Sequence, residues 1–109
     1  MKKIESVYIE DMREAIAAIE RFTSGVSFEQ FAGDEMRYQA VIRMLEVLGE
    51  AANHLSADFR SNHPTLPINK VIAMRNFLIH GYDEVDITVV WETLCNDIPL
   101  LKQSLEVIE

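Results

Sequence analysis

The sequence contains a single cysteine, Cys95, among its 109 residues. One cysteine cannot form an internal disulfide, and the sequence shows no cluster of cysteine and histidine that would suggest a zinc site. We therefore expect Cys95 to be a small buried apolar residue, and we expect the protein to work in a reducing, cytoplasmic environment.

Glycine and proline are also scarce, with 4 Gly and 3 Pro. This leaves little material for the many turns of a β-sandwich. No apolar run approaches the roughly 18 residues that span a membrane, and residues 1–6 lack the pattern of a signal peptide. We expect no contact with a membrane, and the length predicts one domain over residues 1–109.

Positive charge is in short supply, because 10 Lys and Arg face 18 Asp and Glu, for a formal net charge of -8. Such a surface repels phosphates as a whole, which argues against broad, non-specific binding of nucleic acid. Any chemistry on RNA would need a local cationic pocket. Hydrophobic residues reach 49%, and in so short a chain this surplus hints at an apolar face for a partner.

Helical periodicity dominates the sequence. From about Lys3 to Phe22, apolar residues recur at spacings of three and four, which predicts one amphipathic helix. Gly25 suits the left-handed position after its end. Residues 27–30 have the pattern of a capping box that starts a short turn.

A second long helix is predicted from Asp34, a candidate N-cap, to about Leu55. Its apolar residues cover so wide an arc that the helix must be packed on two sides. Two explanations are compatible with this pattern: the helix is central in the bundle, or a second subunit covers part of it. Residues 54–67 then predict a loop.

A short third helix is predicted over about 69–79, ending before Gly81, and a fourth from a cap at Asp86 to about Val107. Pro99 falls inside the fourth helix, where it should cause a kink or a break. No segment makes a convincing strand. The fold class is therefore all-α, with four to five helices around an up-and-down core and a short third helix.

Polar residues gather in the third helix and its exit. Arg75, Asn76, His80 and Tyr82 lie among apolar neighbours, and Asn76 and His80 share a helix face because they are four apart. Arg75 and His80 are five apart, about 140° around a regular helix. A reversal at Gly81 would bring Tyr82 back toward His80.

These residue types suit cleavage of RNA. The last turn of a helix favours the protonated form of His80, and histidine can act as general acid or base. Arg75 offers a permanent bidentate charge for a phosphoryl group, and Asn76 could orient His80 or contact phosphate. This scheme requires no metal or other cofactor.

The spacing alone leaves a structural alternative open. Arg75 could pair with Glu46 or Glu50 while His80 only caps its helix. Acidic residues after the motif could suggest a metal site, but a solvated loop for Asp83 and Glu84 and a helix cap at Asp86 fit better.

Several stretches of the chain resemble the HEPN superfamily, and specifically the HepT-like toxins that are paired with minimal nucleotidyltransferase antitoxins. Residues 34–52 resemble the second helix of that family. Residues 74–82, Met-Arg-Asn-Phe-Leu-Ile-His-Gly-Tyr, resemble its Arg-x4-His-x-Tyr motif. Residues 85–100 resemble its last helix. One departure is Ile68 after Pro67, where the family often has tryptophan; this affects local packing more than chemistry.

The resemblance implies a HEPN-type bundle and a homodimer in which two Arg-x4-His motifs face each other across a cleft. It implies metal-independent endoribonuclease activity, with Arg75 and His80 as the catalytic pair and Asn76 in support. Two copies would build a local positive site that one acidic subunit lacks. Arg43 could add charge to the pocket and Glu50 could hold Arg75, although both could equally form surface ion pairs.

The resemblance also implies control, as in a type VII-like toxin–antitoxin system. A cognate nucleotidyltransferase antitoxin would transfer AMP to Tyr82, adding bulk and negative charge where RNA must bind. A second class of function stays open at this point: a non-catalytic helical partner or nucleotide-binding subunit of a nucleotidyltransferase complex.

Overall fold

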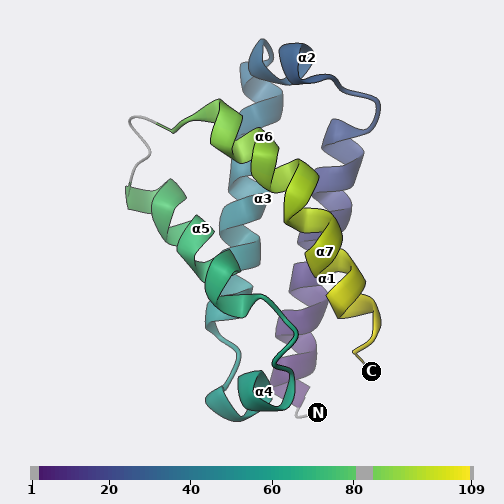
Figure 1. Cartoon of the computed structure of the whole chain (residues 1–109), viewed down its shortest axis with the longest axis vertical. Helices are drawn as coiled ribbons and strands as arrows, with labels where there is room; N and C mark the ends of the chain where they lie inside the picture. The colour runs from purple at the N-terminus through teal and green to yellow at the C-terminus, as the bar shows by residue number, and fades with distance from the viewer. Residues whose placement is uncertain (1–2, 81–84, 109) are drawn as a thin grey trace.

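The computed structural model describes residues 3–80 and 85–108, and every regular element in these ranges is a helix. The all-α prediction is therefore confirmed. Figure 1 shows the arrangement of the helices. In the middle lies α3 (Glu35–Asn53), with α1 (Lys3–Thr23) on one side and α5 (Ile68–His80) on the other, while α6 (Ile87–Asn96) and α7 (Ile98–Glu106) cross in front of them. None of the described helices is both long enough and apolar enough to cross a membrane.

Helices α1 (Lys3–Thr23) and α3 (Glu35–Asn53) form the longest packed pair. The predicted boundaries hold at both junctions. Gly25 has φ 72°, the left-handed conformation, and the capping box at Ser27 starts the short helix α2 (Phe28–Ala32). The carboxylate of Asp34 accepts a hydrogen bond from Arg37 N at 3.1 Å and so caps α3.

Helix α3 is central, because it packs against α1 along one flank and against α5 along the other. Each fully buried aliphatic side chain contributes on the order of 1.5–3 kcal/mol. On α3 the buried apolar side chains follow helical spacing from the middle of the helix to its end: Val41, Ile42, Leu45, Leu48, Ala51 and Ala52. The wide apolar arc is thus explained within one chain, although Met44 and Val47 keep part of their surface exposed.

The loop predicted for residues 54–67 is wrong in its middle, where the chain forms α4 (Ala57–Asn62). Ser56 Oγ accepts from Phe59 N at 3.1 Å, which caps the helix. Phe59 is 6% exposed and joins the core. The backbone N–H of Ser56 also points at the buried carboxylate of Glu5 on α1, at 3.4 Å. A short helix of low intrinsic stability is therefore held by tertiary contacts.

The last third of the chain contains α5 (Ile68–His80), α6 (Ile87–Asn96) and α7 (Ile98–Glu106). The expected break near Pro99 is confirmed, since Asp97 separates α6 from α7 and the proline lies in the first turn of α7. Asp86 caps α6 by accepting from Thr88 N at 2.8 Å. Cys95 is exposed, so its predicted burial is wrong: α6 turns Val90 and Thr93 toward the core instead.

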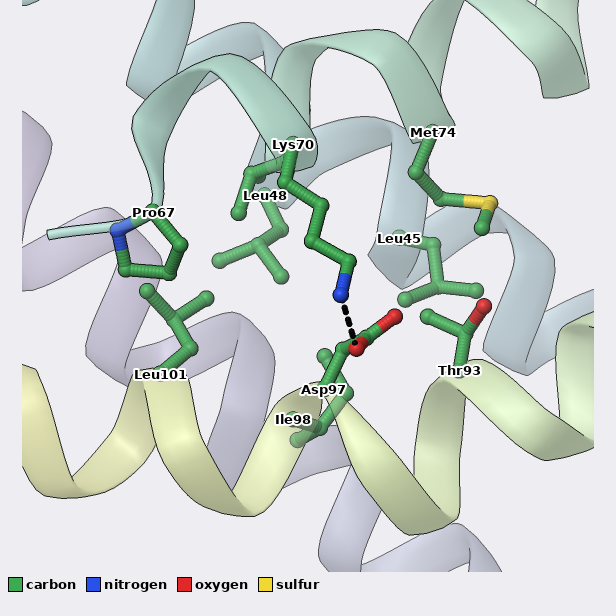
Figure 2. A pocket seen from close by; sticks show the side chains of 10 residues that line it. Leu45, Leu48, Pro67, Lys70, Met74, Thr93, Asp97, Ile98 and Leu101 are labelled. Carbon is green, nitrogen blue, oxygen red and sulfur yellow. Dashed lines mark ion pairs between the residues drawn. The ribbon is translucent and has the colours of Figure 1, made fainter.

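The start of α5 is fixed to the junction of α6 and α7. Figure 2 shows the small apolar pocket between these helices and α3, with the ammonium of Lys70 pointing at Asp97 across it. The two groups form an ion pair of 2.7 Å. Ile68, the residue that departs from the family pattern, is 4% exposed and so fills a core position. These contacts hold the first turn of α5 against the α6–α7 junction.

Candidate functional site

The site is built where α5 crosses α3. The backbones approach closely there because Gly49 of α3 has no side chain. A Cβ placed on Gly49 would overlap Arg75 Cβ and lie 2.7 Å from Arg75 Cγ. Glycine in a helix interior costs about 1 kcal/mol relative to alanine. Here it makes room for the stem of Arg75 and sets the guanidinium beside the next residue of α3, Glu50.

The guanidinium of Arg75 is held by two partners. Its Nη2 donates to Glu50 Oε2 at 2.7 Å, and its Nη1 donates to Asn76 Oδ1 at 3.0 Å. The Arg75 side chain is 26% exposed and that of Glu50 49%. Of the two carboxylates that could pair with Arg75, the structure selects Glu50. The ion pair that the structural alternative expected for Arg75 is thus observed. This pairing is compatible with a catalytic role for Arg75.

Arg75 has more N–H donors than its partners among the described residues use. A guanidinium carries five N–H groups. Its Nε is buried and has no hydrogen-bond partner among the described residues, and each Nη donates one N–H, Nη1 to Asn76 and Nη2 to Glu50. With respect to the described part of the chain, one N–H on each Nη is therefore left. A planar fork with two such donors suits bidentate binding of a phosphate.

Asn76 is exposed at the surface of α5. The sequence suggested that it would orient His80 or contact phosphate, and the observed contact of its side chain is with Arg75 instead. Its amide NH₂ is the end that stays directed away from the guanidinium, because the oxygen accepts from Nη1. Asn76 thus supports the arginine and still offers donors of its own.

His80 is the last residue of α5. The structure describes its backbone only, so its predicted role as acid or base stays a prediction. Gly81, Tyr82 and the acidic residues 83 and 84 lie outside the described residues. The predicted turn and the predicted AMP acceptor are likewise untested by the geometry.

Arg43 and Glu50 share one exposed face of α3. They are seven residues apart, which returns to within about 20° of the same direction around a helix, and both are exposed. In the described part of the chain no ion pair involves Arg43. Its positive charge therefore lies on the same face as the Glu50–Arg75 pair, without an ion-pair partner among the described residues.

Two residues of this region were missed by sequence reasoning. His54, which the sequence placed at the start of a loop, is the C-cap of α3, and its Nε2 lies 3.1 Å from Glu50 Oε1. Tyr8 of α1 stacks on the His54 ring, with centroids 4.9 Å apart and planes 12° from parallel. The spacing of four between Glu50 and His54 was the available signal. We call Tyr8, His54, Glu50, Arg75 and Asn76 the Glu50 network.

The described residues bring together no group of three or more His, Cys, Asp or Glu side chains. His63, the other histidine outside the motif, caps the end of α4, stacks on Phe59 and contacts that residue's carbonyl oxygen at 2.9 Å. It takes no part in the Glu50 network. The chemistry available at the α3–α5 crossing is therefore that of an oriented guanidinium, an amide and, five residues on, a histidine.

Comparison with known proteins identifies the family. The model of a family described as ribonuclease HepT-like matches residues 12–108. A protein of Thermococcus cleftensis, named as a probable ribonuclease HepT, is 44% identical over 106 residues, which is 97% of this chain and 96% of that protein.

Two further relatives are named as candidate RNases. One, from Methanocaldococcus jannaschii, is 31% identical over 107 residues, 98% of each chain. The other, from Caldanaerobacter subterraneus subsp. tengcongensis, is 37% identical over 97 residues, 89% of this chain and 86% of that one. No solved structure matches the chain significantly. The resemblance found in the motifs is confirmed over nearly the full length: the chain belongs to the HepT-like ribonuclease family.

Proposed function

We propose that the protein is a metal-independent endoribonuclease whose site centres on Arg75 and His80. The observation that carries this proposal is that the Arg75 side chain is already oriented in the free protein. The Arg75 side chain is about three-quarters buried, its guanidinium is held by Glu50 and Asn76, and the described residues leave one N–H on each Nη for a ligand. The same helix ends five residues later at His80.

The roles follow from the chemistry of RNA cleavage. A base takes the proton of the 2′-hydroxyl, the oxygen attacks phosphorus, and an acid protonates the leaving 5′-oxygen. His80 supplies the proton transfers, because imidazole ionises near neutral pH. Arg75 stabilises the charge that builds on the phosphoryl oxygens. Asn76 orients Arg75 through its oxygen and can donate to phosphate through its NH₂ group.

The proposal includes a homodimer. Beside the site, α5 exposes Ala73, Asn76 and Phe77, and the Phe77 side chain is 42% exposed. Interface centres are enriched in large aromatic residues and depleted of most charged ones, and this face matches that composition. A second copy across this face would bring two Arg75 and two His80 together, with Arg43 nearby. One histidine would then serve as base and the other as acid.

Regulation is part of the same proposal. A partner nucleotidyltransferase would neutralise the toxin by transferring AMP to Tyr82, two residues beyond His80. An added phosphate beside Arg75 would occupy the cation that the RNA phosphate needs, and the nucleoside would obstruct the cleft. The protein has a net charge of -8, so neutralising one local cationic site would remove most of its attraction for RNA.

The test is cleavage of total cellular RNA by purified, unmodified protein in excess chelator. We expect fragments with wild type and a loss of rate of about 10²–10⁴-fold for His80→Gln. Arg75→Lys should lose about 10²–10³-fold, because lysine keeps the charge but not the fork. The matched controls are His63→Gln and Arg21→Lys, an exposed arginine of α1, which should cut like wild type.

The competing function is a non-catalytic helical subunit of a nucleotidyltransferase complex. It fits the acidic surface, which disfavours RNA. It predicts a stable complex with the partner enzyme, weakened by Arg75→Lys, and intact RNA at every protein concentration. Intact RNA with folded, unmodified wild type would therefore replace the ribonuclease proposal with this one.

A further inference from the structure

The two oxygens of the Glu50 carboxylate contact different partners. Its Oε2 accepts from Arg75 at 2.7 Å, and its Oε1 lies 3.1 Å from His54 Nε2. Glu50 is 49% exposed, so water competes for both oxygens. A half-exposed carboxylate with one partner can rotate about its last bond. Two partners on different oxygens fix that rotation, and with it the direction in which the guanidinium is pulled.

The His54 ring is itself fixed. His54 is the C-cap of α3: its backbone N–H donates to Ala51 O at 3.1 Å, and the N–H of the next residue, Leu55, donates to Ala52 O at 3.2 Å. On α1, Tyr8 stacks on the ring at 4.9 Å between centroids. The ring edge that carries Nε2 faces Glu50, one turn back on α3. Helix α1 therefore contacts, through one imidazole, the carboxylate that holds the arginine of α5.

Within the described part of the chain, the hydrogen-bond partner of the His54 ring is Glu50. Arg60, the nearest cation along the chain, donates to the carbonyls of Ala52, Asn53 and Leu55. Its guanidinium is thereby engaged on the end of α3. An isolated pair of Glu and His at this spacing on a surface helix would contribute little. Here Glu50 also accepts a hydrogen bond from Arg75. If the Glu50 carboxylate rotates more freely, the Arg75 guanidinium that it holds becomes more mobile as well.

We propose that His54, stacked on Tyr8, is a positioning residue of the ribonuclease site, which acts by fixing Glu50 so that Glu50 orients Arg75. The inference rests on the proposed function for its catalytic consequence. The structural consequence is that α1 orients the Arg75 side chain through His54 and Glu50. This consequence rests on the observed contacts alone. No proton transfer by His54 is involved, and His54 does not touch the substrate.

His54→Phe tests this directly. Phenylalanine keeps an aromatic ring against Tyr8 and removes the ring nitrogen that meets Glu50. The matched control is His63→Phe, because His63 also ends a helix and stacks on an aromatic ring, with centroids 4.1 Å apart, but lies outside the Glu50 network. Backbone amide exchange at Leu45 and Leu78, both 2% exposed, reports whether either variant loosens the core.

The first readout is the NMR signal of the Arg75 Nε–H group, which is buried in the wild type and needs no RNA. In His54→Phe its hydrogen exchange should accelerate about fivefold or more, as for partners in one coupled network, while His63→Phe stays within about twofold. Exchange at Leu45 and Leu78 should not change. If the Nε–H of His54→Phe exchanges like wild type, or if His63→Phe accelerates it equally, the proposal is overturned.

The second readout is RNA cleavage. We expect His54→Phe to lower kcat about fivefold with KM within about twofold, and to cause no further loss in a Glu50→Gln background, because His54 acts only through Glu50. Additive losses, or an unchanged kcat beside accelerated Nε–H exchange, would contradict the positioning role. If wild type cuts no RNA, the proposed function fails, and the exchange experiment still decides whether His54 controls Arg75.

Discussion

Glu50 and Arg75 are joined across the crossing of α3 and α5 by a hydrogen bond of 2.7 Å, and Gly49 is the residue that lets the two helices approach closely enough for it. The pair is partly exposed, so its contribution to stability is small, at about 0–1 kcal/mol. Its effect is directional: the carboxylate determines where the guanidinium points. A phosphate that binds Arg75 meets an arginine whose orientation is already set.

Glu50→Gln should separate orientation from charge. The amide keeps the shape of the carboxylate but binds Arg75 more weakly, so kcat should fall by about tenfold. Removing a negative charge beside the site should leave KM for RNA unchanged or lower it. Steady-state cleavage of RNA gives both constants. A rise in KM at constant kcat would show instead that Glu50 contributes to binding and not to the orientation of Arg75.

Gly49→Ala should displace α5. The new Cβ would overlap the Arg75 stem and approach Val71 O at 3.2 Å, and overpacking of this kind costs about 1–3 kcal/mol. The better helix propensity of alanine offsets about 1 kcal/mol of this. Urea unfolding should therefore show a net loss of stability. Gly33→Ala, whose Cβ would come no closer than 3.3 Å to Glu29 O, is the control with the smaller expected effect.

Phe77→Asp should weaken the proposed homodimer. The ring is 42% exposed beside Asn76 on α5, and replacing an interface aromatic by a charge typically costs 2 kcal/mol or more, about thirtyfold in Kd. Sedimentation at several concentrations measures this. Leu100→Asp on α7, which replaces a residue 61% exposed, should leave the Kd unchanged. The reverse ranking of the two variants would move the interface from α5 to α7.

Tyr82→Phe should abolish control without abolishing cleavage. Co-expressed with the proposed partner nucleotidyltransferase, wild type should gain mass in whole AMP units, and its RNA cleavage should be lost. Tyr82→Phe should show neither change, because the acceptor oxygen is missing. Tyr38→Phe, on α3 against Phe31, should behave as wild type. Equal modification of Tyr82→Phe would place the AMP on another residue.

The fold could be predicted where the helix caps, the apolar periodicity and the prolines in the sequence matched the helices and buried faces of the structure. The first two long helices have strong periodicity and their own caps, so the boundaries at Asp34 and Gly25 follow from sequence. The break near Pro99 follows from the missing N–H. Helix α4 could not be predicted in this way, because it depends on Phe59 reaching the core and on Glu5 facing Ser56, contacts between distant parts of the chain.

The site was predictable in its residue types and less so in its contacts. Glu46 and Glu50 are one turn apart on α3, and sequence alone made both candidate partners of Arg75. The choice depends on the register between α3 and α5, which the glycine at position 49 determines. Tyr8 lies 46 positions before His54 in the chain, and only the packing of α1 on α3 brings their rings together.

The central claim, attack by a 2′-hydroxyl under control of Arg75 and His80, is tested most directly by the chemistry of the cut. An RNA oligonucleotide spanning a cleavage site mapped in total RNA is incubated with wild type in chelator, beside the same oligonucleotide with one 2′-deoxy sugar at that site. We predict a 2′,3′-cyclic phosphate and a 5′-hydroxyl from the first and no cleavage of the second. Cleavage of both, or fragments with a 5′-phosphate, would contradict the account.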